Sequence, residues 1–261
     1  MTASPSAALG STGHPSLPAA SRLVVDAPTR MFHWLFALTF VGAYATAESE
    51  HWRLLHVTLG YAFAGLLAFR VLYGIFGPRQ AGLGLLWRRL AGAPAWLRSL
   101  RAARSLSAVH WRQGQNLAMA LAIVSMLALV APLVISGYGT YNDWGDVLGG
   151  DWLEEVHEVV GNAFLSVVLA HLALIAGLSL LRRQNQALAM ITGRVRGSGP
   201  SLVQHNRAWL AGLLLLAVTA FGAWQWRAAP QGPVQTRRDA GTLDSPSWRA
   251  GHRVHRSSDD D

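Results

Sequence analysis

The chain has 261 residues, of which 51% are hydrophobic and 14% are charged, and its mean hydropathy of +0.25 favours a membrane protein over a soluble domain. It contains no Cys, which excludes disulfides, thiolate metal sites and the usual iron–sulfur clusters. The net charge is +8, and every basic residue is Arg. Because these Arg residues gather between apolar segments, they indicate contact with lipid phosphates and not with nucleic acid.

The first two predicted membrane helices each carry a His near one end. The first runs from about residue 31 to 47 and contains His33. The second runs from about 54 to 76, contains His56, and ends before a Gly-Pro pair that stops a helix. Arg70 lies well inside the second span, where a charged side chain needs a partner.

The segment 77–115 is rich in Arg and has no acidic residue. By the positive-inside rule we expect it to be cytoplasmic. Its Leu, Trp and Ala content also predicts a short interfacial helix over about 83–100. The third predicted membrane helix follows at about 117–135, and Pro132 is expected to bend it.

The next loop is acidic, and it is therefore expected on the side of the membrane opposite the cytoplasm. Residues 143–155 contain five acidic residues and no Arg. The fourth span, 154–183, carries His157 and His171 and ends at an Arg pair. A fifth span at 209–226 is long enough to cross and has Trp at both margins.

These segments predict an all-α fold, a transmembrane four-helix bundle with one additional C-terminal transmembrane helix. The bundle domain is expected at 23–196 and the fifth helix at 197–227. Both ends are predicted to be disordered: residues 1–22, which lack the pattern of a secretory signal, and the polar tail 228–261.

The four His residues of the bundle fall into two pairs by depth. His157 and His171 are fourteen positions apart, which places them about 21 Å apart on one helix and within about 40° of the same face. Counted from the outer ends of their spans, His33 lies about 18 Å deeper than His56. His56 is therefore expected to face His157, and His33 to face His171. Two His–His pairs on facing helices of a bundle are the axial donors that two haems require.

Three further residues fit such sites. Gly60 and Gly161 each follow a proposed outer ligand by one turn, where a missing side chain leaves room for a porphyrin; ordinary small-residue packing is the alternative. Arg70 lies fourteen residues after His56, at the depth of the inner pair, where a haem propionate would neutralise it. The alternative for Arg70 is that its side chain reaches the inner interface.

The ordered motifs also resemble a family, the prokaryotic cytochrome b561 family, which includes the cytochrome b subunits of nickel-iron hydrogenases. The resemblance covers about residues 23–196. It rests on Thr29-Arg30-Met31-Phe32-His33-Trp34, Leu55-His56-Val57-Thr58-Leu59-Gly60-Tyr61, Phe69-Arg70-Val71-Leu72-Tyr73-Gly74, His157-Glu158 with His171, and the segment from Asn185 to Arg194.

The resemblance implies a multi-pass protein of the bacterial cytoplasmic membrane. Because two spans precede the cytoplasmic segment 77–115, the N-terminus is expected to be cytoplasmic as well. The resemblance also implies two haem b groups with His33, His56, His157 and His171 as axial ligands. Such a cytochrome carries electrons between a quinone pool and a redox partner in respiratory electron transport. The expected partners are membrane lipid, a quinone or quinol, and a periplasmic c-type cytochrome or a dehydrogenase or hydrogenase subunit.

Other functions stay open at this point. Three redox roles are not separated: quinol-linked subunit of a dehydrogenase, reductase of an outer cytochrome c, and oxidase of a small oxidant. The acidic outer loop favours a basic partner such as a cytochrome c. The main alternative of another class is a divalent-metal transporter, because Glu154, His157 and Glu158 share one helical face. A purely structural assembly protein is the third possibility.

Overall fold

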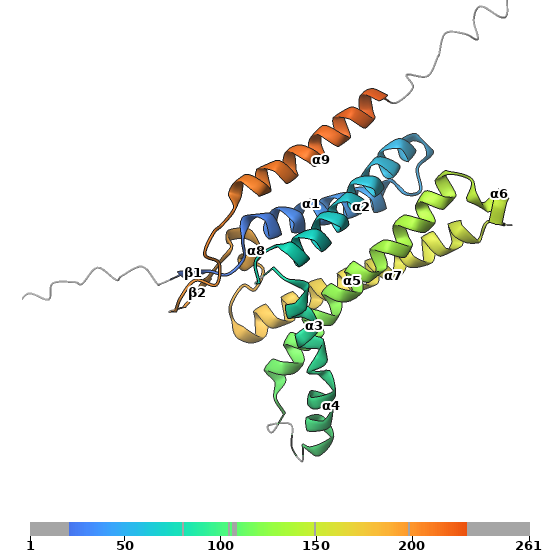
Figure 1. The fold of residues 1–261 in the computed structure, drawn as a ribbon. Helices are drawn as coiled ribbons and strands as arrows, with labels where there is room; N and C mark the ends of the chain where they lie inside the picture. Colours follow the sequence, from blue (N-terminus) through green and yellow to red (C-terminus); the bar gives the residue numbers. More distant parts are fainter. Residues whose placement is uncertain are drawn as a thin grey trace, which may run out of the picture.

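The computed structural model describes residues 21–79, 81–103, 105, 109–148, 150–197 and 199–228. The tails predicted at 1–22 and 228–261 lie outside the described residues except at their inner ends, where Ser21 and Arg22 belong to a short strand and Ala228 ends the last helix. Within the described residues the fold is all-α, as predicted, except for a two-stranded antiparallel ribbon that was not predicted (Figure 1).

Five long helices make up most of the described chain, and shorter elements connect them (Figure 1). The long helices are α1 (Ala27–Thr46), α2 (Arg53–Phe76), α5 (Trp111–Tyr141), α7 (Trp152–Arg182) and α9 (Ala208–Ala228). The short elements are β1 (Ser21–Leu23), η1 (Glu50–Trp52), α3 (Leu83–Ala91), α4 (Ala93–Ala102), α6 (Trp144–Leu148), α8 (Leu188–Thr192) and β2 (Arg194–Arg196).

Four of the described helices are long and apolar enough to cross a membrane. They are α2 together with η1, α5, α7 and α9. The first predicted membrane helix, α1, is not among these four. It nevertheless packs lengthwise against α2, so it belongs to the same bundle.

The bundle is built from two helical hairpins, α1 with α2 and α5 with α7, which meet where α2 contacts α5. Its core takes one buried residue from each of these four helices: Phe40, Phe63, Val130 and Phe164. The ring centroids of Phe40 and Phe164 are 4.5 Å apart, which joins α1 to α7. Helix α9 lies outside this core, against α1 and α2 (Figure 1).

The two ends of the bundle differ in charge, and we name them accordingly. The acidic end carries Glu48 and Glu50 of the α1–α2 connection and the acidic residues between α5 and α7. The basic end carries α3, α4 and the Arg residues around α8. Helices α3 and α4 project from the bundle at this basic end (Figure 1).

Helix α1 begins four residues before the predicted span, for a local reason. Asp26 caps the helix by accepting a hydrogen bond from the Thr29 amide at 3.2 Å, and Pro28 occupies the first turn, where its missing N–H is not needed. The other Asp26 carboxylate oxygen accepts a hydrogen bond from Tyr73 Oη. This carboxylate therefore fixes the start of α1 against the end of α2.

The segment after α7 folds back onto the start of α1. Strand β2 pairs with β1, and the Gly193 carbonyl accepts a hydrogen bond from Val24 N–H at 2.8 Å. Arg30 and Trp34 of α1 donate to the carbonyls of Ile191 and Met190. These contacts close the basic end of the bundle beneath the inner His pair.

Two predicted elements need correction, and one helix is additional. The expected interfacial helix over 83–100 is two helices, α3 and α4, because the chain breaks at Gly92 and restarts with Pro94 in the first turn. The third long helix, α5, has 31 residues and extends beyond the predicted span at both ends. Pro132 lies inside this helix. Helix α6 was not predicted.

Candidate functional site

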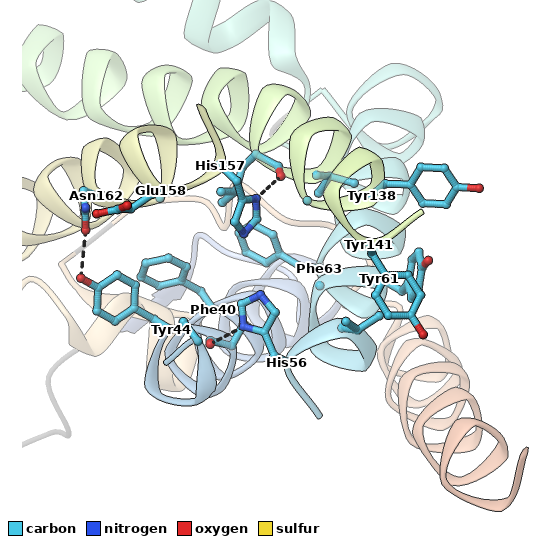
Figure 2. Close-up of a pocket in the computed structure, with 18 of the residues that line it drawn as sticks. Phe40, Tyr44, His56, Tyr61, Phe63, Tyr138, Tyr141, His157, Glu158 and Asn162 are labelled. Carbon is cyan, nitrogen blue, oxygen red and sulfur yellow. Dashed lines mark hydrogen bonds between the residues drawn. The ribbon is translucent and has the colours of Figure 1, made fainter. Parts of the chain in front are cut away.

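His56 of α2 and His157 of α7 face each other near the acidic end of the bundle. Their ring centroids are 6.0 Å apart and their planes are inclined by 77°. Figure 2 shows the two imidazoles on opposite sides of one cavity. The structure thus brings together two side chains that are about a hundred positions apart in the sequence.

Each of these imidazoles is held through its Nδ1 atom by a backbone carbonyl. His56 Nδ1 lies 2.8 Å from the Ala43 carbonyl oxygen on α1, and His157 Nδ1 lies 2.9 Å from the Leu133 carbonyl oxygen on α5. A carbonyl can only accept, so Nδ1 carries the proton in both rings. In the neutral form of each ring the Nε2 atom then carries no hydrogen and can act as a ligand, and the bonds at Nδ1 fix the ring orientation.

The spacing of the two rings suits one metal ion between them. An imidazole nitrogen binds a metal at about 2 Å, so an ion shared by two opposed rings separates their centroids by roughly 6 Å. The observed 6.0 Å agrees with this value. Two imidazoles that face each other at this distance could hold one metal ion between them.

The cavity between the rings is about 280 Å³ and is lined by α1, α2, α5 and α7 (Figure 2). Gly60 and Gly161 both line it. A Cβ at Gly60 would meet no atom within 4 Å, and one at Gly161 would lie 3.7 Å from Leu133 Cδ1. Neither glycine is required by close helix packing, so both leave open space beside the His pair.

A third glycine, Gly137 of α5, contacts His157 directly and was missed by sequence reasoning. A Cβ at this position would lie 2.6 Å from Cε1 and 2.8 Å from Nδ1 of His157. Only a residue without a side chain lets this imidazole pack against the backbone of α5. Ser136 adds a contact, with its Oγ 3.4 Å from His157 Nδ1. The predicted third span ended at residue 135, so both residues fell outside it.

The second pair, His33 of α1 and His171 of α7, lies toward the basic end. His171 is close enough to His33 for the two imidazoles to interact electrostatically. Both Nδ1 atoms are buried, and neither has a hydrogen-bond partner among the described residues. Buried polar atoms are normally hydrogen-bonded. The two unpartnered nitrogen atoms therefore mark this pair as a place where a bound group could lie.

The aromatic core separates the two His pairs. On α7, Phe164 lies seven residues after His157 and seven before His171, a rise of about 10 Å in each direction. Phe164 is 1% exposed, and its ring centroid is 5.5 Å from that of Phe63. A closely packed aromatic layer therefore lies between the two His pairs.

Arg70 is buried near the basic end and has a protein partner. Its Nη1 donates to the Ala81 carbonyl at 2.9 Å, which joins α2 to the segment before α3. Asp26 is the acidic group that interacts with it. The neighbouring Phe69 contacts Phe32, next to His33, so Arg70 lies near the level of the inner pair.

The residues of the alternative metal site do not form a cluster. Glu158 lines the cavity beside His157, whereas Glu154 does not. Within the described part of the chain, no group of three or more His, Asp or Glu side chains is arranged to hold a metal ion. The geometry thus gives the divalent-metal transporter no support.

Comparison with known families identifies the family of this chain. A family model described as prokaryotic cytochrome b561 matches residues 24–193. The matched region contains all four His residues of the two pairs and ends before α9. Comparisons with curated proteins and with solved structures found no significant match.

Proposed function

The chain belongs to the prokaryotic cytochrome b561 family, and on this basis we propose that it is a di-haem b-type cytochrome that carries electrons across the membrane. Membership implies binding of b-type haem, and the apolar helices make the chain a multi-pass membrane protein. The observation that best supports the proposal is the His56–His157 pair, in which both Nδ1 atoms are bound to carbonyls and neither Nε2 atom is hydrogen-bonded to a described residue.

His56 and His157 would hold one haem near the acidic end, and His33 and His171 would hold the other near the basic end. Haem supplies a metal ion that gains and loses one electron. The chain positions the donors: the carbonyls of Ala43 and Leu133 orient the outer imidazoles and raise their basicity. Gly60 and Gly161 would provide room for a macrocycle beside the outer pair.

Arg70 is a proposed contact of the inner haem. Its positive charge, placed at the level of His33 and His171, would favour the reduced iron and the ionised propionates. A lower midpoint potential of one haem in an Arg70→Leu protein would support this role, and an unchanged potential would contradict it.

We propose that the 23–196 domain and the fifth helix at 197–227 together give five crossings, with α1 and α9 both spanning. The Arg-rich basic end would then be cytoplasmic, together with the N-terminus, in the bacterial cytoplasmic membrane. The acidic end would face the periplasm and favour a basic redox partner such as a c-type cytochrome. A dehydrogenase or hydrogenase subunit is the other class of partner, and the quinone pool lies within the membrane.

The transmembrane step can be tested in sealed vesicles. The purified holoprotein is reconstituted with ferricyanide trapped inside, and dithionite is added outside as an impermeant reductant. We expect ferricyanide to be consumed only in vesicles that contain the protein, and a His171→Ala protein to be strongly impaired. Equal rates in protein-free vesicles and in vesicles with both haems bound would contradict the proposal.

A further inference from the structure

Arg207 lies immediately before α9, beyond the part of the chain that the family model matches. Its backbone φ is 44°, in the left-handed region that residues other than Gly rarely adopt unless their surroundings hold them there. The preceding residue, Asn206, accepts a hydrogen bond from the Ala27 amide through both its backbone carbonyl, at 3.2 Å, and its side-chain Oδ1, at 3.0 Å. The start of α9 is therefore fixed against the start of α1 at the basic end (Figure 1).

The side chain of Arg207 is linked to a buried carboxylate through one hydroxyl group. Its guanidinium donates a hydrogen bond to Tyr73 Oη, near the end of α2. That hydroxyl in turn donates to the carboxylate of Asp26, which is 3% exposed. Hydrogen bonds in series polarise one another, so the positive charge of Arg207 acts on Asp26 through the Tyr73 hydroxyl.

Arg70 is a second cation beside the same carboxylate. It lies three residues before Tyr73 on α2, which places both side chains on one face of the helix. Asp26 interacts with Arg70 electrostatically, but the hydrogen bonds to the carboxylate come from the Thr29 amide and the Tyr73 hydroxyl. Arg70 instead donates to the Ala81 carbonyl at 2.9 Å. The carboxylate thus lies between two arginines, and its bonded link leads to Arg207.

We propose that Arg207 is a positioning residue for Arg70, because it neutralises Asp26 through Tyr73 and so leaves the Arg70 charge available to the inner haem. This inference rests on the proposed function, since it concerns the haem that would lie near Arg70. A buried carboxylate that loses one cation needs another. Without Arg207, Arg70 would pair with Asp26, and its charge would no longer favour the reduced iron. The segment that leads into α9 thereby sets the potential of a site to which it supplies no ligand.

The test is a redox titration of the full-length holoprotein in lipid nanodiscs, with each haem followed by its absorbance. Arg207→Met is compared with wild type at the wild-type midpoint potential of the haem that responds to Arg70→Leu. We expect the ratio of reduced to oxidised haem to fall about tenfold. A tenfold change corresponds to ~59 mV for one electron. The other haem should keep its potential.

Arg183→Met is the matched control. Arg183 also lies at the basic end and also has a positive φ, of 49°, and its side chain is exposed. Salt and water screen an exposed charge, so this variant should stay within about twofold of wild type. An Arg207→Met protein that behaves like Arg183→Met would overturn the inference.

Two further variants separate positioning from a simple loss of charge. Tyr73→Phe keeps the ring stacked on Phe69, with centroids 5.5 Å apart, but removes the hydroxyl that links Arg207 to Asp26. It should lower the ratio as Arg207→Met does, and it keeps the test decisive if Arg207→Met does not fold. In an Arg70→Leu background, Arg207→Met should cause no more than about a twofold further fall, since the two arginines act as one unit. An equal fall in both backgrounds would overturn the positioning role.

Haem content is measured on each preparation, which separates the two proposals. Protein with both haems whose potentials are unchanged in Arg207→Met and Tyr73→Phe would overturn this inference alone. Unchanged potentials in Arg70→Leu would overturn the role of Arg70 and this inference with it. Folded wild-type protein without haem would overturn the proposed function itself.

Discussion

A His157→Ala protein is expected to bind one haem where the wild type binds two. The substitution removes one of the two axial donors of the outer site and leaves His56 without an opposing ring. His33 and His171 lie about 21 Å away along the bundle, so the inner site should keep its haem. The measurement is haem per chain by pyridine haemochrome, with the reduced-minus-oxidised spectrum recorded on the same sample.

The chain provides a matched control for this change. His51 lies in η1, five residues before His56, and it is exposed. His51→Ala should retain both haems. If His157→Ala also retains both, then His157 is not a ligand; if it loses both while His51→Ala loses none, the two sites are not independent.

Replacing Gly137 with Ala is expected to weaken haem binding at the outer site, although no ligand is changed. The new Cβ would stand 2.6 Å from His157 Cε1, so the imidazole must move off its carbonyl partner. Disturbing the groups that orient a metal ligand typically costs about 10–100-fold in affinity. Alanine is also a better helix former than glycine by about 1 kcal/mol, so a loss of haem could not be attributed to a weaker helix.

Gly177→Ala is the control for this substitution. Gly177 lies on α7, the helix that carries His157, and a Cβ there would meet nothing within 4 Å. The electron paramagnetic resonance spectrum of the oxidised protein reports the axial geometry of each haem. We expect the outer-haem signal to shift or decrease in Gly137→Ala and to remain unchanged in Gly177→Ala. An unchanged signal in both would show that the contact has no bearing on the site.

The positions of the long helices could be predicted because a helix that crosses a membrane needs a long apolar segment. The facing of His56 and His157 was accessible too, since helical rise and the alternating direction of the spans fix their relative depth. His33 and His171 interact electrostatically, which agrees with the depths predicted for them from the helical rise. Whether all four residues are haem ligands is still a prediction.

The contacts of His157 could not be predicted from the sequence. Gly137 lies twenty residues before His157 and on another helix, so no rule based on spacing along one helix would select it. Spacing along the helix instead indicates Gly161, one turn after His157, which lines the cavity without touching another helix closely. Backbone carbonyls such as that of Leu133 carry no sequence signal at all.

The long-range contacts at the basic end could not be predicted from the sequence either. Strand β1 pairs with β2 across more than 170 positions, and neither strand has enough residues to show an alternating pattern. The early start of α1 did have a signal, an Asp followed two positions later by Pro, which is typical of a capped helix.

The central claim is that one chain holds two haems, and the most direct test is the haem-to-protein ratio of the purified wild-type chain. The pyridine haemochrome of protein from haem-sufficient cells should give two b-type haems per chain, with the protein determined by amino-acid analysis. One haem would mean that one of the two His pairs is not a site. No haem in a folded sample would contradict the account.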